Sequence, residues 1–441
     1  MKSSLRPAFL ATVVTPWLAI VPAAARAQDT LRLETLHEQA LSSDPRSRQL
    51  ALLRSQSDLR LRSLTTERLP QFNVTGEATH QSDVTSVKLA IPGGGPPEPP
   101  KDRWQTQVNL QQLLYDGGSI GARRDIERAR LTEARENVRT AQYRLRTEVN
   151  SAFFSAFLLQ ERIAELDALI GDLDARLDVV RARVREGAAL PGEAAAIDAE
   201  RLRAMQARSD ARASRVASLT TLAQLSGTTV DERSMLALPD HRAAVDSARA
   251  AGGPDSVRAR PEFAQFEGAR ERLARETRLA AAERRPKLYA FGQAGLGKPG
   301  LDQFNREPDE FYMAGVRLEW RFWNWGTTSR SQEILRLQQR IVDTEEAAFA
   351  EALERAVQID LADMQRLEEA VQTDDRILAL REQIERQARA QLAEGAITAA
   401  DYVDARTDVL EARLSRQRHR VELAQARARY LTTLGLAPAA P

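Results

Sequence analysis

Two stretches of sequence decide the fold: Val108–Gly118, which reads VNLQQLLYDGG, and Val316–Gly326, which reads VRLEWRFWNWG. Each stretch alternates apolar and polar residues, continues into aromatic residues and ends at a glycine. The second stretch begins 208 residues after the first, and the Glu-Gly-Ala triplets around Gly187 and Gly395 have the same spacing. A constant spacing over such a distance indicates an internal duplication of the chain.

Upstream of these stretches the two copies are spaced differently, by 216 residues, as Pro70 and Pro286 show. The difference of eight residues falls in the interval that contains Ile91–Pro100, a run of glycine and proline. Such a run predicts a surface loop, where changes of length are tolerated. The duplication therefore extends over nearly the whole chain.

Each copy has the same predicted order: a helix that ends at a proline, two strands joined by a loop, a very long helix, a glycine turn and a shorter helix. The region between the copies is rich in glycine, proline, serine and alanine and predicts an irregular connector. The expected units are a signal peptide, 1–27; a first repeat, 28–227, with a β-hairpin at about 72–114 and a helical hairpin at about 120–225; an equatorial connector, 228–257; and a second repeat, 258–441, with a β-hairpin at about 288–322 and a helical hairpin at about 329–434.

The first 27 residues have the pattern of a secretory signal peptide. A basic start precedes the apolar stretch Ala8–Val21, and Ala25–Ala27 reads Ala-Arg-Ala, which is typical of a cleavage site. The alternative is a membrane anchor, but the apolar run is short for a membrane span and contains Pro16. We therefore predict export from the cytoplasm.

The strands alternate with period two over about 11 residues, the length of a membrane-spanning strand. In the second copy, one face carries large apolar residues and the other carries Arg317, Glu319 and Arg321, which we expect to line a lumen. Periodicity alone equally allows a soluble hairpin with one buried face. Four strands cannot close a barrel, so a barrel would be shared between chains, with eight strands from two or twelve from three.

Aromatic residues gather where the second strand of each copy ends. Such positions form the girdles of membrane β-barrels at the lipid interface. The alternative is packing at the joint between strand and helix. The predicted membrane-interface residues are Tyr115, Trp320, Trp323 and Trp325.

The predicted helix Ile120–Glu186 contains no proline and would be about 100 Å long. Within it, apolar residues are spaced by four and three in turn from Leu166 to Val184. This spacing is a heptad pattern and requires a partner helix. The two shorter helices of the same copy would together nearly match its length, which predicts a uniform wall of paired helices.

Composition excludes several classes of function. The chain has 63 basic and 62 acidic residues, so nucleic acid is not an expected partner. The absence of cysteine excludes a disulfide scaffold and a cysteine metal site. The four histidines are scattered, and no catalytic motif is present. We predict no enzymatic activity, no cofactor and no metal.

The duplicated order of elements, the Tyr115–Gly118 junction (Tyr-Asp-Gly-Gly) and the Glu-Gly-Ala turns resemble TolC-like outer-membrane efflux proteins. The resemblance covers essentially the whole mature chain. It implies a mainly α-helical protein that forms a homotrimer, with a twelve-stranded β-barrel in outer-membrane lipid on a long periplasmic α-helical barrel. It also implies a passive exit duct for a tripartite efflux or type I secretion system, whose partners are a periplasmic adaptor (membrane fusion) protein and an inner-membrane pump.

The resemblance further assigns the two turns to the periplasmic end of the duct. The expected adaptor-docking tips are Glu186, Gly187 and Ala188 in the first copy and Glu394, Gly395 and Ala396 in the second.

Family members commonly carry acidic residues six and nine positions after the second turn glycine, where this chain has Asp401 and Asp404. In the first copy Glu193 has the six-residue spacing. In a trimer these residues would form rings of carboxylates and a cation-binding periplasmic gate. The alternative is that they are acids favoured at a helix start. The arginine that helps to lock the tip in family members is replaced by Ile397.

Two other classes of protein are alternatives to an outer-membrane efflux protein. A periplasmic adaptor also has a helical hairpin, but it should have one hairpin flanked by two halves of a β-domain. A secreted coiled-coil structural protein would explain the long helices, but it does not account for two alternating strand pairs.

Overall fold

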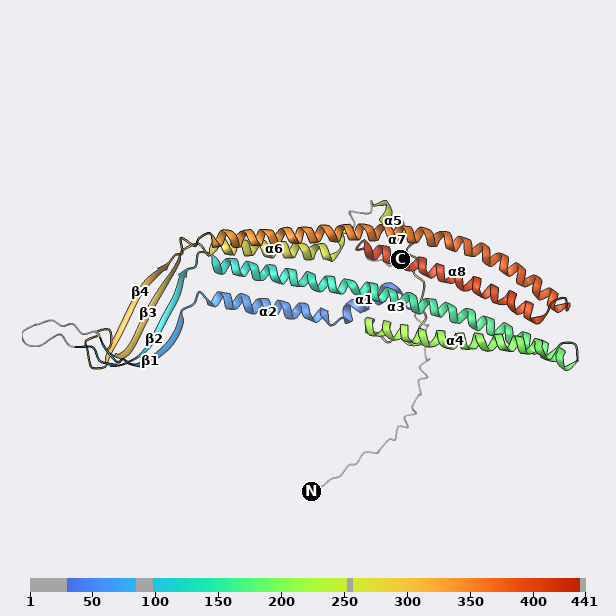
Figure 1. Ribbon diagram of the computed structural model, residues 1–441, viewed down its shortest axis with the longest axis horizontal. Coiled ribbons are helices and arrows are strands. Elements are labelled where there is room, and N and C mark those ends of the chain that lie inside the picture. The colour runs from blue at the N-terminus through green and yellow to red at the C-terminus, as the bar shows by residue number, and fades with distance from the viewer. Residues whose placement is uncertain (1–29, 85–97, 252–256, 437–441) are drawn as a thin grey trace, which may run out of the picture.

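The computed structural model describes residues 30–84, 98–251 and 257–436. The predicted signal peptide and most of the proline-rich loop lie outside these ranges. The described chain is mostly helical, with one four-stranded sheet at one end and the tips of two helical hairpins at the other (Figure 1). The helices are α1 (Leu33–Ser43), α2 (Arg46–Thr66), α3 (Ser119–Arg185), α4 (Pro191–Ser226), α5 (Arg242–Ala250), α6 (Pro261–Ala282), α7 (Thr327–Ala393) and α8 (Ala399–Thr433); the strands are β1 (Gln71–His80), β2 (Asp102–Tyr115), β3 (Lys287–Lys298) and β4 (Asp309–Glu319).

The two long helices show the duplication most clearly. Both α3 and α7 have 67 residues, and α7 begins and ends 208 residues after α3. Each is preceded by a left-handed glycine, Gly118 with φ +89° and Gly326 with φ +75°. Glycine reaches this conformation without the steric cost of a Cβ atom, which explains why it occurs at the same place in both copies.

The four strands form one antiparallel sheet in the order β1-β2-β3-β4. The central pair, β2 and β3, joins the two halves of the chain, while β1 and β4 are the outer strands of this single-chain sheet. Strand β4 ends at Glu319, whereas the alternation of the sequence predicted a strand to about residue 322. Arg321 therefore lies beyond the strand that was expected to carry it, at the turn into α7.

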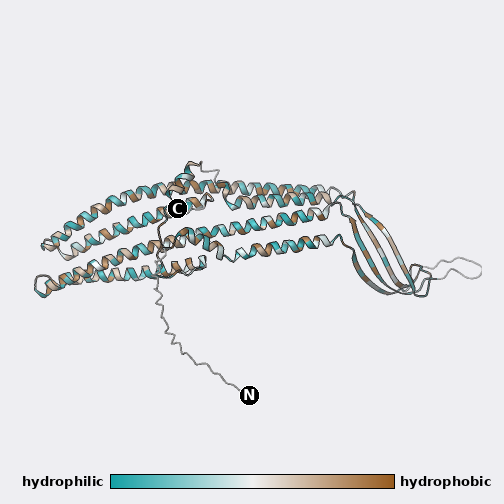
Figure 2. Cartoon of the chain, turned by 180° about the vertical axis from the view of Figure 1, so that it is seen from behind, coloured by the Kyte–Doolittle hydropathy of each residue, from teal (hydrophilic) through white to brown (hydrophobic). Residues whose placement is uncertain are grey.

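The helices pack side by side in one curved layer, in the order α2, α3, α6 and α7 near the sheet (Figure 1). Polar and apolar residues are interleaved along them (Figure 2). The predicted heptad positions of α3 are buried except the last, Val184, which is half-buried. Leu166, Leu173 and Leu177 are each at most 3% exposed and pack with Ile197 of α4. None of the described helices is long and apolar enough to cross a membrane.

A second core lies at mid-length, where α1 and the connector cross the long helices. Phe153 and Phe154 of α3 pack edge to face, with ring centroids 5.4 Å apart. They join Leu36 of α1 and Leu222 of α4 in one buried cluster. Sequence analysis predicted neither α1 nor α5, and the connector that it expected to be irregular contains α5.

Candidate functional site: the sheet and the helical tips

The strand register places the apolar residues of all four strands on one face of the sheet. Val74 of β1 is paired with Val108 of β2, which is paired with Ala294 of β3, which is paired with Tyr312 of β4. Directly paired residues point to the same side of a sheet. This face is solvent-exposed in the single chain: Val74, Tyr312 and Val316 are 70%, 83% and 66% exposed. A continuous apolar face of this kind marks a surface that contacts lipid or another protein.

The opposite face of the sheet is lined with amides. The side chain of Gln107 donates a hydrogen bond to Asn109, 3.1 Å away, and Asn109 donates one to the hydroxyl of Thr75, also 3.1 Å away. Arg317 and Glu319, the predicted lumen residues within β4, lie on this face by register. The guanidinium of Arg317 stacks over the ring of Phe291 at 5.1 Å. The two faces differ in polarity most clearly on β1 and β2, because on β3 and β4 the amide face also carries Tyr289, Phe291, Phe311 and Met313.

The aromatic cluster lies at the joint between sheet and helices. Trp320, Trp323 and Trp325 are 58%, 65% and 79% exposed. The indole nitrogen of Trp320 donates to the backbone oxygen of Arg284 at 3.2 Å. Trp325 has φ +54° and is the one non-glycine residue with positive φ in the described ranges. This backbone conformation is unfavourable for a side chain of this size. The turn from β4 into α7 therefore holds Trp325 in a strained conformation.

The two predicted tips have the same geometry. The amide of Gly187 donates to Val184 at 3.1 Å and that of Ala188 to Arg183 at 2.8 Å; in the second copy the corresponding distances are again 3.1 and 2.8 Å. These are the two hydrogen bonds of a Schellman motif, which ends a helix at a left-handed residue. Gly187 and Gly395 have φ +74° and +71°, and a Cβ atom at either would meet no other atom within 4 Å. Glycine is therefore favoured at both tips by backbone conformation, not by crowding.

Of the predicted gate residues, Asp401 and Glu193 take part in helix capping. The carboxylate of Asp401 accepts hydrogen bonds from the backbone amide and the hydroxyl of Thr398, at 2.9 and 2.7 Å. These bonds hold the pKa of the Asp401 carboxyl below its ordinary value. Glu193 accepts from the amide of Leu190 at 3.2 Å. Asp404 is exposed, and no ion pair to it occurs among the described residues.

A polar cluster above the tips joins the two helical hairpins, and sequence analysis missed it. The hydroxyl of Tyr402 on α8 donates to Asp172 of α3 at 3.1 Å, and Arg406 donates to the same carboxylate at 3.0 Å. The guanidinium of Arg176 lies over the tyrosine ring at 4.6 Å. Tyr402 is fully buried. Its partner is 230 residues away in sequence, so no local pattern indicates the contact.

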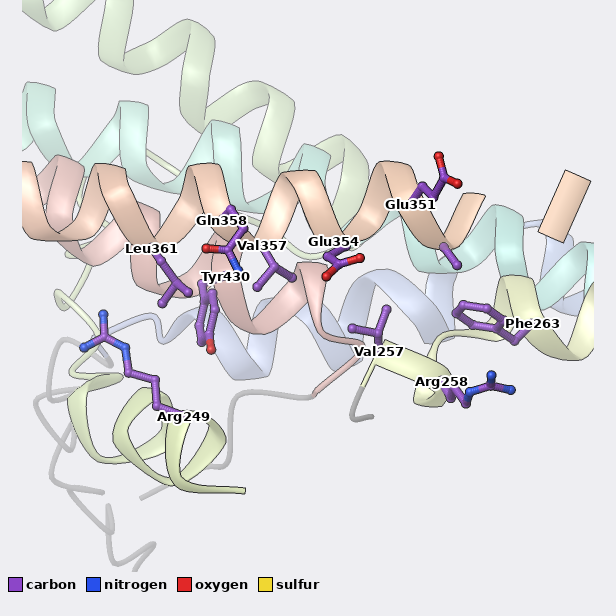
Figure 3. A pocket seen from close by; sticks show the side chains of 11 residues that line it. Arg249, Val257, Arg258, Phe263, Glu351, Glu354, Val357, Gln358, Leu361 and Tyr430 are labelled. Atoms are coloured by element: carbon purple, nitrogen blue, oxygen red, sulfur yellow. The ribbon is translucent and has the colours of Figure 1, made fainter. Parts of the chain in front are cut away.

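A cavity of about 500 Å³ lies beside the connector. Arg249 of α5 and Phe263 of α6 lie at its two ends, with Leu361 of α7 and Tyr430 of α8 between them (Figure 3). No group of three or more His, Asp or Glu side chains in the described ranges could hold a metal ion.

Comparison with known proteins agrees with this geometry. Residues 36–228 match the model of the outer membrane efflux protein family. This stretch covers most of the first repeat and less than half of the chain. No curated protein matches the sequence.

Solved structures of membrane proteins share the fold of this chain over both of its halves. It is similar to CusC, with 16% identity, a TM-score of 0.69 and coverage of 92% of each chain. VceC from Vibrio cholerae has 15% identity and a TM-score of 0.66, over 91% of this chain and 96% of that one. The open-state channel MtrE from Neisseria gonorrhoeae has 17% identity and a TM-score of 0.65, over 92% and 89%.

Proposed function

We propose that this chain is a TolC-like outer membrane efflux protein and serves as the exit duct of a tripartite efflux or type I secretion system. It would be a homotrimeric, passive conduit, gated at its periplasmic tips. The observation that carries the proposal is the sheet, whose register gathers apolar residues on one face and amides on the other. Its outer strands, β1 and β4, are open in the single chain. In lipid, open strand edges must be paired, so β4 of one chain would pair with β1 of the next.

Three chains would supply twelve strands, with the apolar face toward lipid and the amide face toward a lumen. Arg317 and Glu319 would line this lumen, while Arg321 would lie at its base. The exposed aromatics Tyr115, Trp320, Trp323 and Trp325 would form the girdle at the periplasmic side of the membrane. The Glu-Gly-Ala turns at the far ends of the hairpins would contact an adaptor protein, which connects the duct to an inner-membrane pump.

Asp404, together with Asp401 and Glu193, would form the gate. In the trimer these carboxylates would lie close together and repel each other. Cations bound between them would relieve the repulsion and lower the conductance of the duct. The capping bonds of Asp401 and Glu193 are the geometry expected of acids at a helix start. Asp404 is therefore the residue on which the proposed gate chiefly depends.

The test of the duct is purification in detergent followed by reconstitution. Native mass spectrometry should give three chains, and insertion into planar bilayers should give discrete conductance steps. A water-soluble monomer without conductance would contradict the proposal and favour a secreted structural protein. An adaptor would also lack conductance, and it would bind the pump directly.

A further inference from the structure

The duplication allows a prediction of how neighbouring chains meet, because the chain already contains one contact between a first and a second copy. Inside the chain, α3 of the first copy packs against α6 of the second. We call this contact the in-chain seam. In a closed ring of alternating copies, α7 would face α2 of the next chain in the same way. We call that contact the chain–chain seam; it rests on the proposed ring.

The in-chain seam is held by ion pairs and a close backbone approach. Arg272 of α6 donates to Glu133 of α3 at 2.7 Å, and Arg130 of α3 lies 3.3 Å from Glu276 of α6. At Gly268, a Cβ atom would lie 3.1 Å from the Cα of Glu133. The helices therefore touch where one of them has no side chain.

The repeat spacings give the residues that would occupy the same places between chains. Adding 208 to an α3 position gives its α7 counterpart, and subtracting 216 from an α6 position gives its α2 counterpart. Glu133 then corresponds to Ile341, and Gly268 corresponds to Leu52. The charged residues Arg272 and Arg130 correspond to Gln56 and Gln338.

The counterparts are large, apolar and uncovered in the single chain. Ile341 is 57% exposed and Leu52 is 68% exposed. On the same face of α7, Ile334 and Leu337 are 55% and 47% exposed, while their counterparts on α3, Ile126 and Ala129, are buried. On α2, Leu59 follows Leu52 by seven residues, which is two helical turns, and is 62% exposed. At Ile341 and Leu52 the stripes are apolar where the in-chain seam has a charged residue or a glycine, whereas Ile334 and Leu337 have apolar counterparts.

The joint with the sheet follows the same rule. A Cβ atom at Gly117 would lie 2.7 Å from the Cβ of Arg285. The counterparts of this pair are Trp325 and Leu69, which are 79% and 56% exposed. Trp325 would therefore contact the end of α2 of the next chain, at the level of the proposed aromatic girdle.

We infer that the stripe Ile334, Leu337 and Ile341 of α7 docks on Leu52 and Leu59 of α2 in a second copy of this chain. The chain–chain seam would thus be more apolar than the in-chain seam. Association of separate chains costs translational and rotational freedom, and burial of apolar side chains opposes that cost. The in-chain seam has no such cost, because its partners are already connected, and ion pairs with little net stability suffice there.

Cysteine cross-linking tests the seam directly, since the chain has no cysteine. The variant Leu52→Cys/Ile341→Cys is treated in outer membranes with a short bis-maleimide and run on a denaturing gel. Within one chain α2 and α7 are separated by α3 and α6 (Figure 1), so a band of higher mass reports contact between chains. We expect dimer and trimer bands. The matched control is Leu52→Cys/Ala347→Cys. Arg139, the counterpart of Ala347 on α3, is exposed although α3 has a helix on each side. Ala347 should therefore stay outside the chain–chain seam.

The outcomes separate the seam from the duct. A native trimer whose Leu52→Cys/Ile341→Cys variant cross-links no better than the control overturns the seam and leaves the duct intact. If the largest cross-linked band contains a number of chains other than three, the result supports the seam and contradicts the trimer. If the double-cysteine variant does not assemble, substitutions with glutamate test the seam without cross-linking. Ile341→Glu should reduce the fraction of trimer, and Ala347→Glu should not. Adding Gln56→Arg to Ile341→Glu should restore the trimer, because the two new residues copy the Glu133–Arg272 pair of the in-chain seam. Equal trimer loss in the two Glu variants would overturn the seam.

Discussion

The helices α3 and α7 have the same length and the same glycine boundaries, but their surroundings differ. Among the described residues, 21 positions of α3 are buried and only 9 of α7. Leu169 of α3 is 2% exposed, while its counterpart on α7, Ile377, is 43% exposed. The reason is position: α3 lies between helices on both sides, and α7 lies at the edge of the layer. Apolar residues at the same repeat position are therefore buried within the chain on α3 and exposed on α7. Those on α7 can be covered only by another molecule.

The largest expected effect concerns the two tips, where the copies are alike. Replacing both glycines, Gly187→Val and Gly395→Val, forces a β-branched residue into a left-handed backbone. We expect export to be lost while the trimer is still recovered from the outer membrane, since a side chain at either position meets no neighbour. Export of a pump substrate and trimer yield are the measurements.

The two single variants compare the copies at the tips. Each should lose export partially, if both tips contact the adaptor. Full export by the double variant would show that the tips are not the docking site.

The second effect compares the cores of α3 and α7. Leu169→Ala should lower the free energy of unfolding by about 2–5 kcal/mol, as expected for a buried leucine. Ile377→Ala should change the unfolding of the helices little and should instead lower the temperature at which the trimer dissociates. Circular dichroism follows the first process and native gels at increasing temperature follow the second.

Val179→Ala is the control for Leu169→Ala, because Val179 is an exposed position of α3, at 55%. It should change stability by no more than about 0.5 kcal/mol. Equal losses at Leu169 and Val179 would mean that α3 is not the central helix of the layer.

The third effect belongs to the first copy, whose α1 carries His37. Its Nε2 bonds to Asn150 of α3 at 2.8 Å, and burial lowers its pKa from 6.5 to about 4. Between these values the unfolded chain binds more protons than the folded one, so stability falls as the pH is lowered from about 7 to 4. The loss at the lower limit is about 3 kcal/mol.

The pH dependence is measured from the thermal midpoint in detergent at pH 7 and pH 4.5. His37→Gln, which cannot take up a proton, should flatten the dependence over this range. An unchanged slope in this variant would assign the acid sensitivity to other groups, among them His241, whose pKa burial also lowers.

The smallest effect separates the gate acids. Asp404→Ala should weaken the block of single-channel current by divalent or hexammine cations applied from the periplasmic side. Asp401→Ala should weaken it less, because Thr398 already binds the Asp401 carboxylate. Asp401→Asn, which changes the charge and keeps a side-chain acceptor for the cap, is the control for loss of the helix start. Equal block in the wild type and in Asp404→Ala would exclude the proposed gate.

The sequence by itself determined the features that depend on local backbone and side-chain pattern. The spacing of the glycines located both long helices to within two residues, because a left-handed residue interrupts a helix wherever it occurs. The heptad positions of α3 from Leu166 to Val180 are buried as predicted, since a helical stripe follows from residue spacing. The alternation of β2 and β4 predicted which side of each strand is apolar.

Only the tertiary structure decided how these parts meet. The end of β4 at Glu319 was not predicted, because the alternation continues through Trp320 and Phe322 while the backbone already turns toward α7. The contact of Tyr402 with Asp172 joins residues 230 positions apart, and a buried tyrosine has the same periodicity as any apolar residue. The exposure of Ile334 and the burial of its counterpart Ile126 could not be distinguished from sequence, because burial depends on which helix has a neighbour on each side.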